Sequence, residues 1–254
     1  MKRYAIAIIG ALGIVASGAA ISGENGHHGA VHWGYEGEGA PFMWGSLKEE
    51  FATCGEGKSQ SPIDISSVVV TELPAIQVDY KDTPLEILNN GHAVQVNYGE
   101  GSSVTVGGKT YQLLQFHFHA PSEHTIGGKY YPMVAHLVHK AGDGSLGVIG
   151  IMMKEGAENS LIKSLWAHLP AAAGQKESVS DVNINVADLL PKDMTYFNYS
   201  GSLTTPPCTE GVNWMVLAAP VSVSAQQIGQ FTAILSGTNR PVQALNGRTV
   251  RLGN

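Results

Sequence analysis

The segment that decides the fold is Gln115-Phe116-His117-Phe118-His119, in which polar and aromatic side chains alternate. Successive residues of a β-strand point to opposite faces, so Gln115, His117 and His119 share one face and the two phenylalanines share the other. The segment therefore predicts a strand that buries its aromatic face and presents two imidazoles on its opposite face.

A third imidazole, that of His136, lies in the next strand-like segment, residues 134–139. If the two strands pair, His136 completes a set of three histidines. Three neutral imidazoles suit Zn²⁺, and a catalytic zinc keeps its fourth position for water. The ligand type also fits copper or another metal, and ordinary strand histidines without a metal are the alternative.

Short apolar segments separated by Gly, Asn and Pro continue outward from these two strands. Helical spacing of Leu161, Leu165 and Trp166 predicts a helix over 159–168, and a second helix is expected over 225–236. The predicted fold class is mainly β (α+β), a single domain with a few short surface helices. Strands are expected at 68–70, 76–80, 85–88, 93–98, 103–106, 110–118, 134–139 and 146–153.

Composition excludes several classes of protein. The 254 residues include 15 Lys+Arg and 21 Asp+Glu, a net charge of -6, so the chain has no electrostatic footprint for nucleic acid. A hydrophobic content of 43% excludes a disordered chain. Two cysteines are too few for a disulfide scaffold.

The first residues are typical of an export signal. A basic start at Lys2 and Arg3 precedes an apolar run over 4–16 and small residues that end at Ala20. The run is shorter than the roughly 20 residues that cross a bilayer, so a membrane anchor is the less favoured alternative. We expect a signal peptide over 1–20, cleavage near Ala19 or Ala20, a periplasmic or secreted location, and no membrane span in the mature chain.

The mature chain is expected to begin with a mobile Gly- and His-rich N-terminal tail over 21–40, followed by one domain over 41–254. The His27-His28 pair is expected to be solvated. Export permits a disulfide between Cys54 and Cys208, the only two cysteines. Two independent buried thiols are the alternative.

Several short motifs, in this order and spacing, resemble the alpha-class carbonic anhydrases, in particular the exported bacterial members. The resemblance implies a central twisted, mostly antiparallel sheet with zinc at the base of a cone-shaped cleft. The motifs are His32-Trp33-Gly34-Tyr35, Gln60-Ser61-Pro62-Ile63-Asp64-Ile65, Asn89-Asn90-Gly91-His92, residues 115–124, residues 136–139, residues 201–208 and Asn239-Arg240-Pro241.

The resemblance implies reversible hydration of CO₂ to bicarbonate and a proton, by attack of zinc-bound hydroxide. His117, His119 and His136 match the zinc ligands. Thr204 matches the threonine whose hydroxyl donates to a glutamate, here Glu123, and accepts from the hydroxide. His92 matches the proton-shuttle histidine, although without the resemblance it is more typical of a solvated loop.

Further positions match the walls and supports of the family's cleft. Gln115 and His124 match residues that support the zinc ligands, and Cys54 and Cys208 match the family's disulfide. The expected partners are CO₂, bicarbonate and water, with sulfonamide-type and anion inhibitors, and the bacterial relatives suggest a homodimer. The water network for proton transfer is expected at Tyr35, Asn90 and Gln95, and the substrate pocket at Val138, Val148, Leu203, Thr205, Val212 and Trp214, whose valines are otherwise typical of plain strand core.

One position departs from the family. The residue two before the third ligand is usually glutamate, which accepts the other N–H of the ligating imidazole; here it is Val134. Losing such a partner typically lowers metal affinity or activity 10–100-fold. The sequence therefore leaves open an alternative to the enzyme, a catalytically weakened zinc-containing binding or structural module of the same fold. A metal-free β-rich adhesion domain is a third reading.

Overall fold

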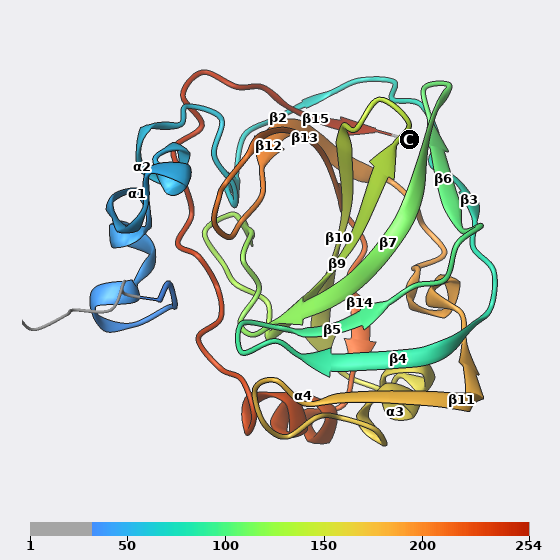
Figure 1. Ribbon diagram of the computed structural model, residues 1–254. Helices are drawn as coiled ribbons and strands as arrows, with labels where there is room; N and C mark the ends of the chain where they lie inside the picture. Colours follow the sequence, from blue (N-terminus) through green and yellow to red (C-terminus); the bar gives the residue numbers. More distant parts are fainter. Residues whose placement is uncertain (1–31, 254) are drawn as a thin grey trace, which may run out of the picture. The chain divides into compact units, whose positions relative to one another are not determined.

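A 13-stranded mixed sheet organises the chain in the computed structural model, which describes residues 32–253 (Figure 1). The expected signal peptide over 1–20, residues 21–31 of the expected tail and the His27-His28 pair lie outside the described residues. Among residues 32–253, no helix has the length and apolar character needed to span a membrane.

Three long antiparallel strands form the middle of this sheet: β7 (Lys109–His119), β9 (Met133–Ala141) and β10 (Leu146–Glu155). The sheet order is β11-β4-β5-β7-β9-β10-β13-β12-β15-β2, and most pairs are antiparallel, as expected. The exceptions in this sheet are β10 with β13, β10 with β14, and β15 with β2, which run parallel. The flanking strands are β11 (Lys176–Ile184), β4 (Thr83–Asn89), β5 (Val94–Asn97), β13 (Glu210–Leu217), β12 (Tyr196–Ser202), β15 (Val250–Gly253), β2 (Val68–Val70), β14 (Val221–Val223), β3 (Gln77–Asp79) and β6 (Ser103–Val106).

Every strand predicted from the sequence is present, with ends shifted by at most a few residues. The structure adds a small parallel pair, β1 (Asp64–Ile65) with β8 (Thr125–Ile126), and five further strands, β11 to β15. The burial pattern of β11 is almost entirely exposed, so its sequence carries no hydrophobic alternation that could have predicted it.

The helices are short and lie at the margins of the sheet (Figure 1). The two predicted helices are confirmed as α3 and α4, and both begin at a capping side chain: Asn159 before α3, and Ser224 in a capping box with Gln227 before α4. The set comprises α1 (Trp44–Leu47), α2 (Thr53–Glu56), α3 (Ser160–Trp166), α4 (Ala225–Thr232) and the 3-10 turns η1 (Gly37–Gly39), η2 (Pro41–Met43), η3 (Glu49–Phe51) and η4 (Val186–Leu189).

The two faces of β7 lie in different environments, as the alternation predicts. Phe116 and Phe118 are fully buried in the larger hydrophobic core together with Leu137 and Ile149. On the other side, β9 contributes Val134 to a second core. The central strands therefore separate a purely structural core from the face that carries the histidines.

The prediction of a mobile tail is wrong for residues 32–40, because these residues pack against the domain. The Trp44 indole donates hydrogen bonds of 2.9 Å to the carbonyls of Gly34 and Gly39, and Ala40 is buried. Aromatic burial outweighs the Gly-rich composition here, because the indole satisfies backbone carbonyls that water would otherwise solvate.

The Cys54–Cys208 disulfide is present, with a Cα–Cα distance of 5.0 Å. It connects α2 to the segment that follows β12, across a sequence separation of 154 residues. The two cysteines are therefore one bridge and not two free thiols.

Candidate metal centre

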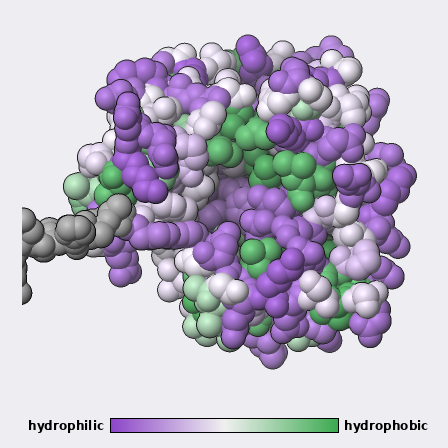
Figure 2. Space-filling view, in the orientation of Figure 1, coloured by the Kyte–Doolittle hydropathy of each residue, from purple (hydrophilic) through white to green (hydrophobic). Residues whose placement is uncertain are grey.

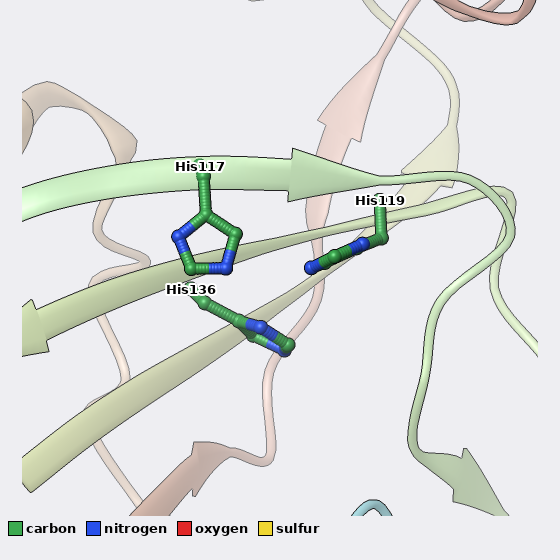
Figure 3. A group of neighbouring side chains, drawn as sticks. All are labelled: His117, His119 and His136. Carbon is green, nitrogen blue, oxygen red and sulfur yellow. The ribbon is translucent and has the colours of Figure 1, made fainter. Parts of the chain in front are cut away.

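The three histidines meet because β7 and β9 pair in the expected register. His117 lies directly opposite His136, and His119 lies opposite Val134. All three rings point toward one another from the two strands (Figure 3), and their ligand nitrogens lie within 4.8 Å of one another.

Hydrogen bonds to neighbours fix which ring nitrogen faces inward. Nδ1 of His117 lies 2.8 Å from Oε1 of Gln115, and Nδ1 of His119 lies 2.6 Å from the carbonyl of Thr238. Because Nδ1 can donate to these acceptors, Nε2 of both rings keeps a free lone pair for a metal.

His136 faces the site through its other nitrogen. Its Nδ1 and Nε2 of His119 each lie 3.7 Å from Oε2 of Glu123, so both nitrogens point to the same region. Nε2 of His136 points outward instead; it is buried and has no hydrogen-bond partner among residues 32–253.

The electrostatics of the cluster favour neutral rings. Burial, reinforced by the neighbouring imidazoles, holds the pKa values of His117 and His136 well below the usual range. Neutral imidazole is the form that binds a transition metal. Three converging imidazole nitrogens, with an inward nitrogen of His119 that has no hydrogen-bond partner among residues 32–253, fit a tetrahedral Zn²⁺ that keeps one open position.

Glu123 lies beneath the histidines and is fully buried. Its Oε1 accepts a 3.0 Å hydrogen bond from the backbone N–H of Arg240. The contact that the resemblance implies between the Thr204 hydroxyl and Glu123 is not among the hydrogen bonds of residues 32–253; Glu123 Oε2 has no partner there. Thr204 itself is buried at the edge of the site.

An apolar lobe of the cleft adjoins the histidines, with a volume of about 220 Å³. Five of the six residues expected in the substrate pocket line this lobe, whereas Val212 does not and lies buried in the second core. The lining residues are Gln115, His117, His136, Val138, Val148, Leu203, Thr204, Thr205 and Trp214.

A second, polar lobe of about 140 Å³ extends from the same histidines toward His92. It shares Gln115, His117 and Thr205 with the apolar lobe, so the two lobes meet at the metal centre. Figure 2 shows a hollow in this face of the molecule, with hydrophobic residues gathered on one side and hydrophilic residues on the other. The polar lobe is lined by Trp33, Asn90, His92, Ala93, Gln95, Gln115, His117, His119 and Thr205.

His92 lines the polar lobe and stacks on Trp33 with ring centroids 3.6 Å apart. The ring of His32 lies 5.2 Å away on a parallel plane. Partial burial, and to a smaller degree the proximity of His32, lowers the pKa of His92. Of the three residues expected to order water, Asn90 and Gln95 line this lobe and Tyr35 does not; the Tyr35 hydroxyl is buried without a partner among the described residues.

Three groups that support the site had no role predicted from the sequence. The Thr238 carbonyl holds His119, and a backbone carbonyl carries no signal in a sequence. Trp33 and Arg240 lie in quoted motifs without an assigned role. Arg240 is 1% exposed, and its guanidinium donates to Gln60, to the Ser61 carbonyl and to the Cys54 carbonyl; it connects the Glu123 loop to the disulfide.

Comparisons with known proteins agree with this geometry. The family model for eukaryotic-type carbonic anhydrases matches residues 39–254. The carbonic anhydrases of Pectobacterium atrosepticum and Neisseria gonorrhoeae are 45% and 44% identical, over 87% and 93% of this chain and 91% and 93% of their own lengths.

Solved structures give the same answer. The alpha-carbonic anhydrase of Thermovibrio ammonificans, solved with the inhibitor sulfanilamide, is 44% identical with a TM-score of 0.84 and covers 88% of this chain and 100% of its own. A hyperthermostable carbonic anhydrase from a hydrothermal vent chimney is 49% identical with a TM-score of 0.84 and the same coverage. The chain therefore belongs to the eukaryotic-type, or alpha-class, carbonic anhydrase family of enzymes.

Proposed function

We propose that this chain catalyses the reversible hydration of CO₂ to bicarbonate and a proton, with zinc held by His117, His119 and His136. One observation supports this proposal most strongly: the three converging imidazoles lie where an apolar lobe and a polar lobe of the cleft meet. Reaction of an apolar gas with water needs both kinds of surface at one metal.

Zinc, when bound, lowers the pKa of a water to about 7, as is established for carbonic anhydrases as a class, so that a nucleophile is available at neutral pH. Val138, Val148 and Trp214 hold CO₂ next to the histidines, because the valines have no hydrogen-bonding group and the Trp214 N–H already donates to the Ser202 carbonyl, so this wall offers water no hydrogen bond. Leu203 and Thr205 complete that wall on the side of Thr204.

Glu123 and Thr204 orient the nucleophile. The buried Glu123 carboxylate, held by the Arg240 N–H, accepts a hydrogen bond from the Thr204 hydroxyl once the Thr204 side chain turns toward it. The Thr204 oxygen then accepts from the attacking oxygen and directs its remaining lone pair at the carbon.

His92 carries the released proton to solvent along the polar lobe. Asn90 and Gln95 line the path and order water between the histidines and His92. A pKa below the usual histidine value leaves His92 neutral at neutral pH, in the form that accepts a proton.

Residues 1–20 act as a cleaved export signal, and the mature domain works in the periplasm or outside the cell, where the Cys54–Cys208 bridge is stable. Sulfonamides and small anions bind the open metal position, in keeping with the sulfanilamide complex of the Thermovibrio ammonificans enzyme. A homodimer is part of the proposal without a named interface.

The test is CO₂ hydration by the purified mature chain, measured with its zinc content. One zinc per chain and rapid hydration that a primary sulfonamide abolishes support the proposal. His119→Ala, which removes a ligand from the centre of the site, should lose both zinc and activity.

Stoichiometric zinc without inhibitable hydration favours the alternative of a zinc-containing binding module. The unpaired outer nitrogen of His136 favours this alternative. The fold also occurs in a protein that is not named a carbonic anhydrase: a dioscorin solved with ascorbate shares it, at 29% identity and a TM-score of 0.82.

A further inference from the structure

The three histidines of the metal centre are not supported equally. The outward nitrogen of His117 has a side-chain acceptor 2.8 Å away, and that of His119 has a carbonyl 2.6 Å away. The outward nitrogen of His136, Nε2, is buried with no partner among residues 32–253. Metal-ligating histidines ordinarily donate this second N–H to an acceptor, which fixes the tautomer and the ring orientation.

Val134 occupies the place from which an acceptor would reach His136. It lies two residues before His136 on β9 and directly opposite His119 on β7, so its side chain shares the strand face that carries the ligand. It is 0% exposed and packs in the second core with Val148 and Trp214. An aliphatic side chain here excludes water and offers no lone pair.

The surroundings of His136 supply no substitute. The Trp214 ring lies 4.9 Å from the His136 ring, but its indole N–H is a donor and is already used by the Ser202 carbonyl. The ring of His124 lies 6.2 Å away; its Nε2 pairs with the Tyr199 hydroxyl, and its Nδ1 is a second buried nitrogen without a partner in the described chain. Each of two neighbouring imidazoles thus has one buried ring nitrogen without a hydrogen-bond partner in the described chain.

We propose that Val134, because its side chain has no hydrogen-bond acceptor, leaves His136 the least firmly held of the three ligands. Zinc then leaves this chain faster than it leaves the same chain with an acceptor at position 134. The inference rests on the proposed zinc function and concerns retention of the metal, not the reaction. The expected difference in metal affinity is roughly 10–100-fold.

The experiment compares the native chain with Val134→Gln, Val134→Glu and Val134→Met. Glutamine and glutamate add an oxygen acceptor, whereas methionine has nearly the length of glutamine with only a weak sulfur acceptor. Each zinc-loaded protein is mixed with excess chelator, and the zinc that remains bound is followed over time. Zinc loss from the Gln and Glu variants should be about 10-fold slower or more, and loss from the Met variant should match or exceed the native rate.

Equal loss from all four proteins overturns the inference, and so does a Met variant that retains zinc as well as the Gln variant, because filled volume would then be the cause. Circular dichroism and unfolding midpoints show which variants fold.

The native holoenzyme gives an independent measurement: in its imidazole NMR spectrum, the ring N–H protons of His117 and His119 should lie further downfield than that of His136. A His136 proton as far downfield as that of His119 contradicts the inference even if no variant folds.

Failure of the proposed function looks different. A native chain that takes up no zinc overturns both the zinc site and this inference. A native chain that binds one zinc and hydrates CO₂, but releases zinc no faster than Val134→Gln, overturns the inference alone.

Discussion

At the scale of single residues, the site divides into side chains that hold a metal and side chains that move a proton. We assign His92 to the second group, because it lines the polar lobe, stacks on Trp33 and is not one of the three converging histidines. Replacement of His92 by Ala should therefore lower the CO₂ hydration rate in dilute buffer by about 100-fold, the lower end of the usual range for general acid–base groups.

Added imidazole buffer provides the control for His92→Ala, because a free imidazole in the cleft can carry the same proton. Recovery of most of the rate in imidazole, with zinc content unchanged, supports a shuttle role. A rate that is equal in native and variant protein at low buffer concentration places the proton path elsewhere.

His139 shows how a buried histidine couples stability to pH. Its Nε2 pairs with the Tyr80 hydroxyl at 2.7 Å, and burial lowers its pKa to about 4. The unfolded chain binds a proton near pH 6.5 and the folded chain does so only near 4. The stability that His139 contributes is thus complete above pH 6.5 and is lost as pH falls toward 4.

His139→Gln should flatten this dependence. The slope of unfolding free energy against pH between 4 and 6.5 should fall by about 1.4 kcal/mol per pH unit, the contribution of one proton. Denaturant unfolding at a series of pH values measures it for both proteins. Identical slopes would mean that His139 takes up its proton equally in the folded and unfolded chains.

Much of the site was predictable at this scale, for a physical reason. Alternation along residues 115–119 places His117 and His119 on one face whatever the rest of the chain does. The Thr238 carbonyl and the Trp33 stack were not predictable, because a carbonyl has no sequence identity and a stack depends on tertiary placement. Val134 was visible in the sequence, and the structure added that the His136 nitrogen beside it lacks a partner.

At the scale of elements, the β7–β9 pair was predictable and the strands after β10 were not. β7 alternates between buried and more exposed residues over most of its length, and β9 is a nearly continuous buried segment that ends at polar residues. Strand β11 is mostly exposed, and β13 pairs in parallel with β10 through a long connection. The local pattern of polar and apolar residues predicts neither an exposed strand nor the partner of a strand that is reached through a long connection.

Strand β12 approaches its neighbours closely at Gly201, just before Thr204. A Cβ there would overlap Ser61 Oγ and would lie 2.7 Å from Tyr199 and 2.8 Å from Trp214. Gly201→Ala should therefore destabilise the fold by about 1–3 kcal/mol through overpacking, measured by denaturant unfolding.

Gly229 supplies the matched control, because it lies in α4 and a Cβ there meets nothing within 4 Å. Gly229→Ala should stabilise the protein by roughly 0.5–1 kcal/mol, since alanine loses less backbone entropy in a helix. Equal effects of the two substitutions would contradict the close packing of β12.

At the scale of the whole molecule, the disulfide and Arg240 join distant parts of the chain beside the site. Cys54 and Cys208 are 154 residues apart, and the Arg240 guanidinium donates to the Cys54 carbonyl. Cys54→Ser with Cys208→Ser should lower the free energy of unfolding by about 2–5 kcal/mol.

The reductant dependence of the native chain is the control for the double serine variant. Native protein in strong reductant should approach the variant's unfolding midpoint, and the variant should not respond to reductant. An unfolding midpoint that is the same in the variant and in oxidised native protein would show that the bridge adds no stability.

The central claim is that one bound zinc ion gives this chain its CO₂ hydration activity. A zinc titration of the metal-free mature chain tests this claim most directly. The account predicts that the CO₂ hydration rate rises linearly with added zinc, stops at one equivalent, and falls to the uncatalysed rate when a primary sulfonamide is added. A hydration rate that stays at the uncatalysed level after one equivalent of zinc has bound would contradict it.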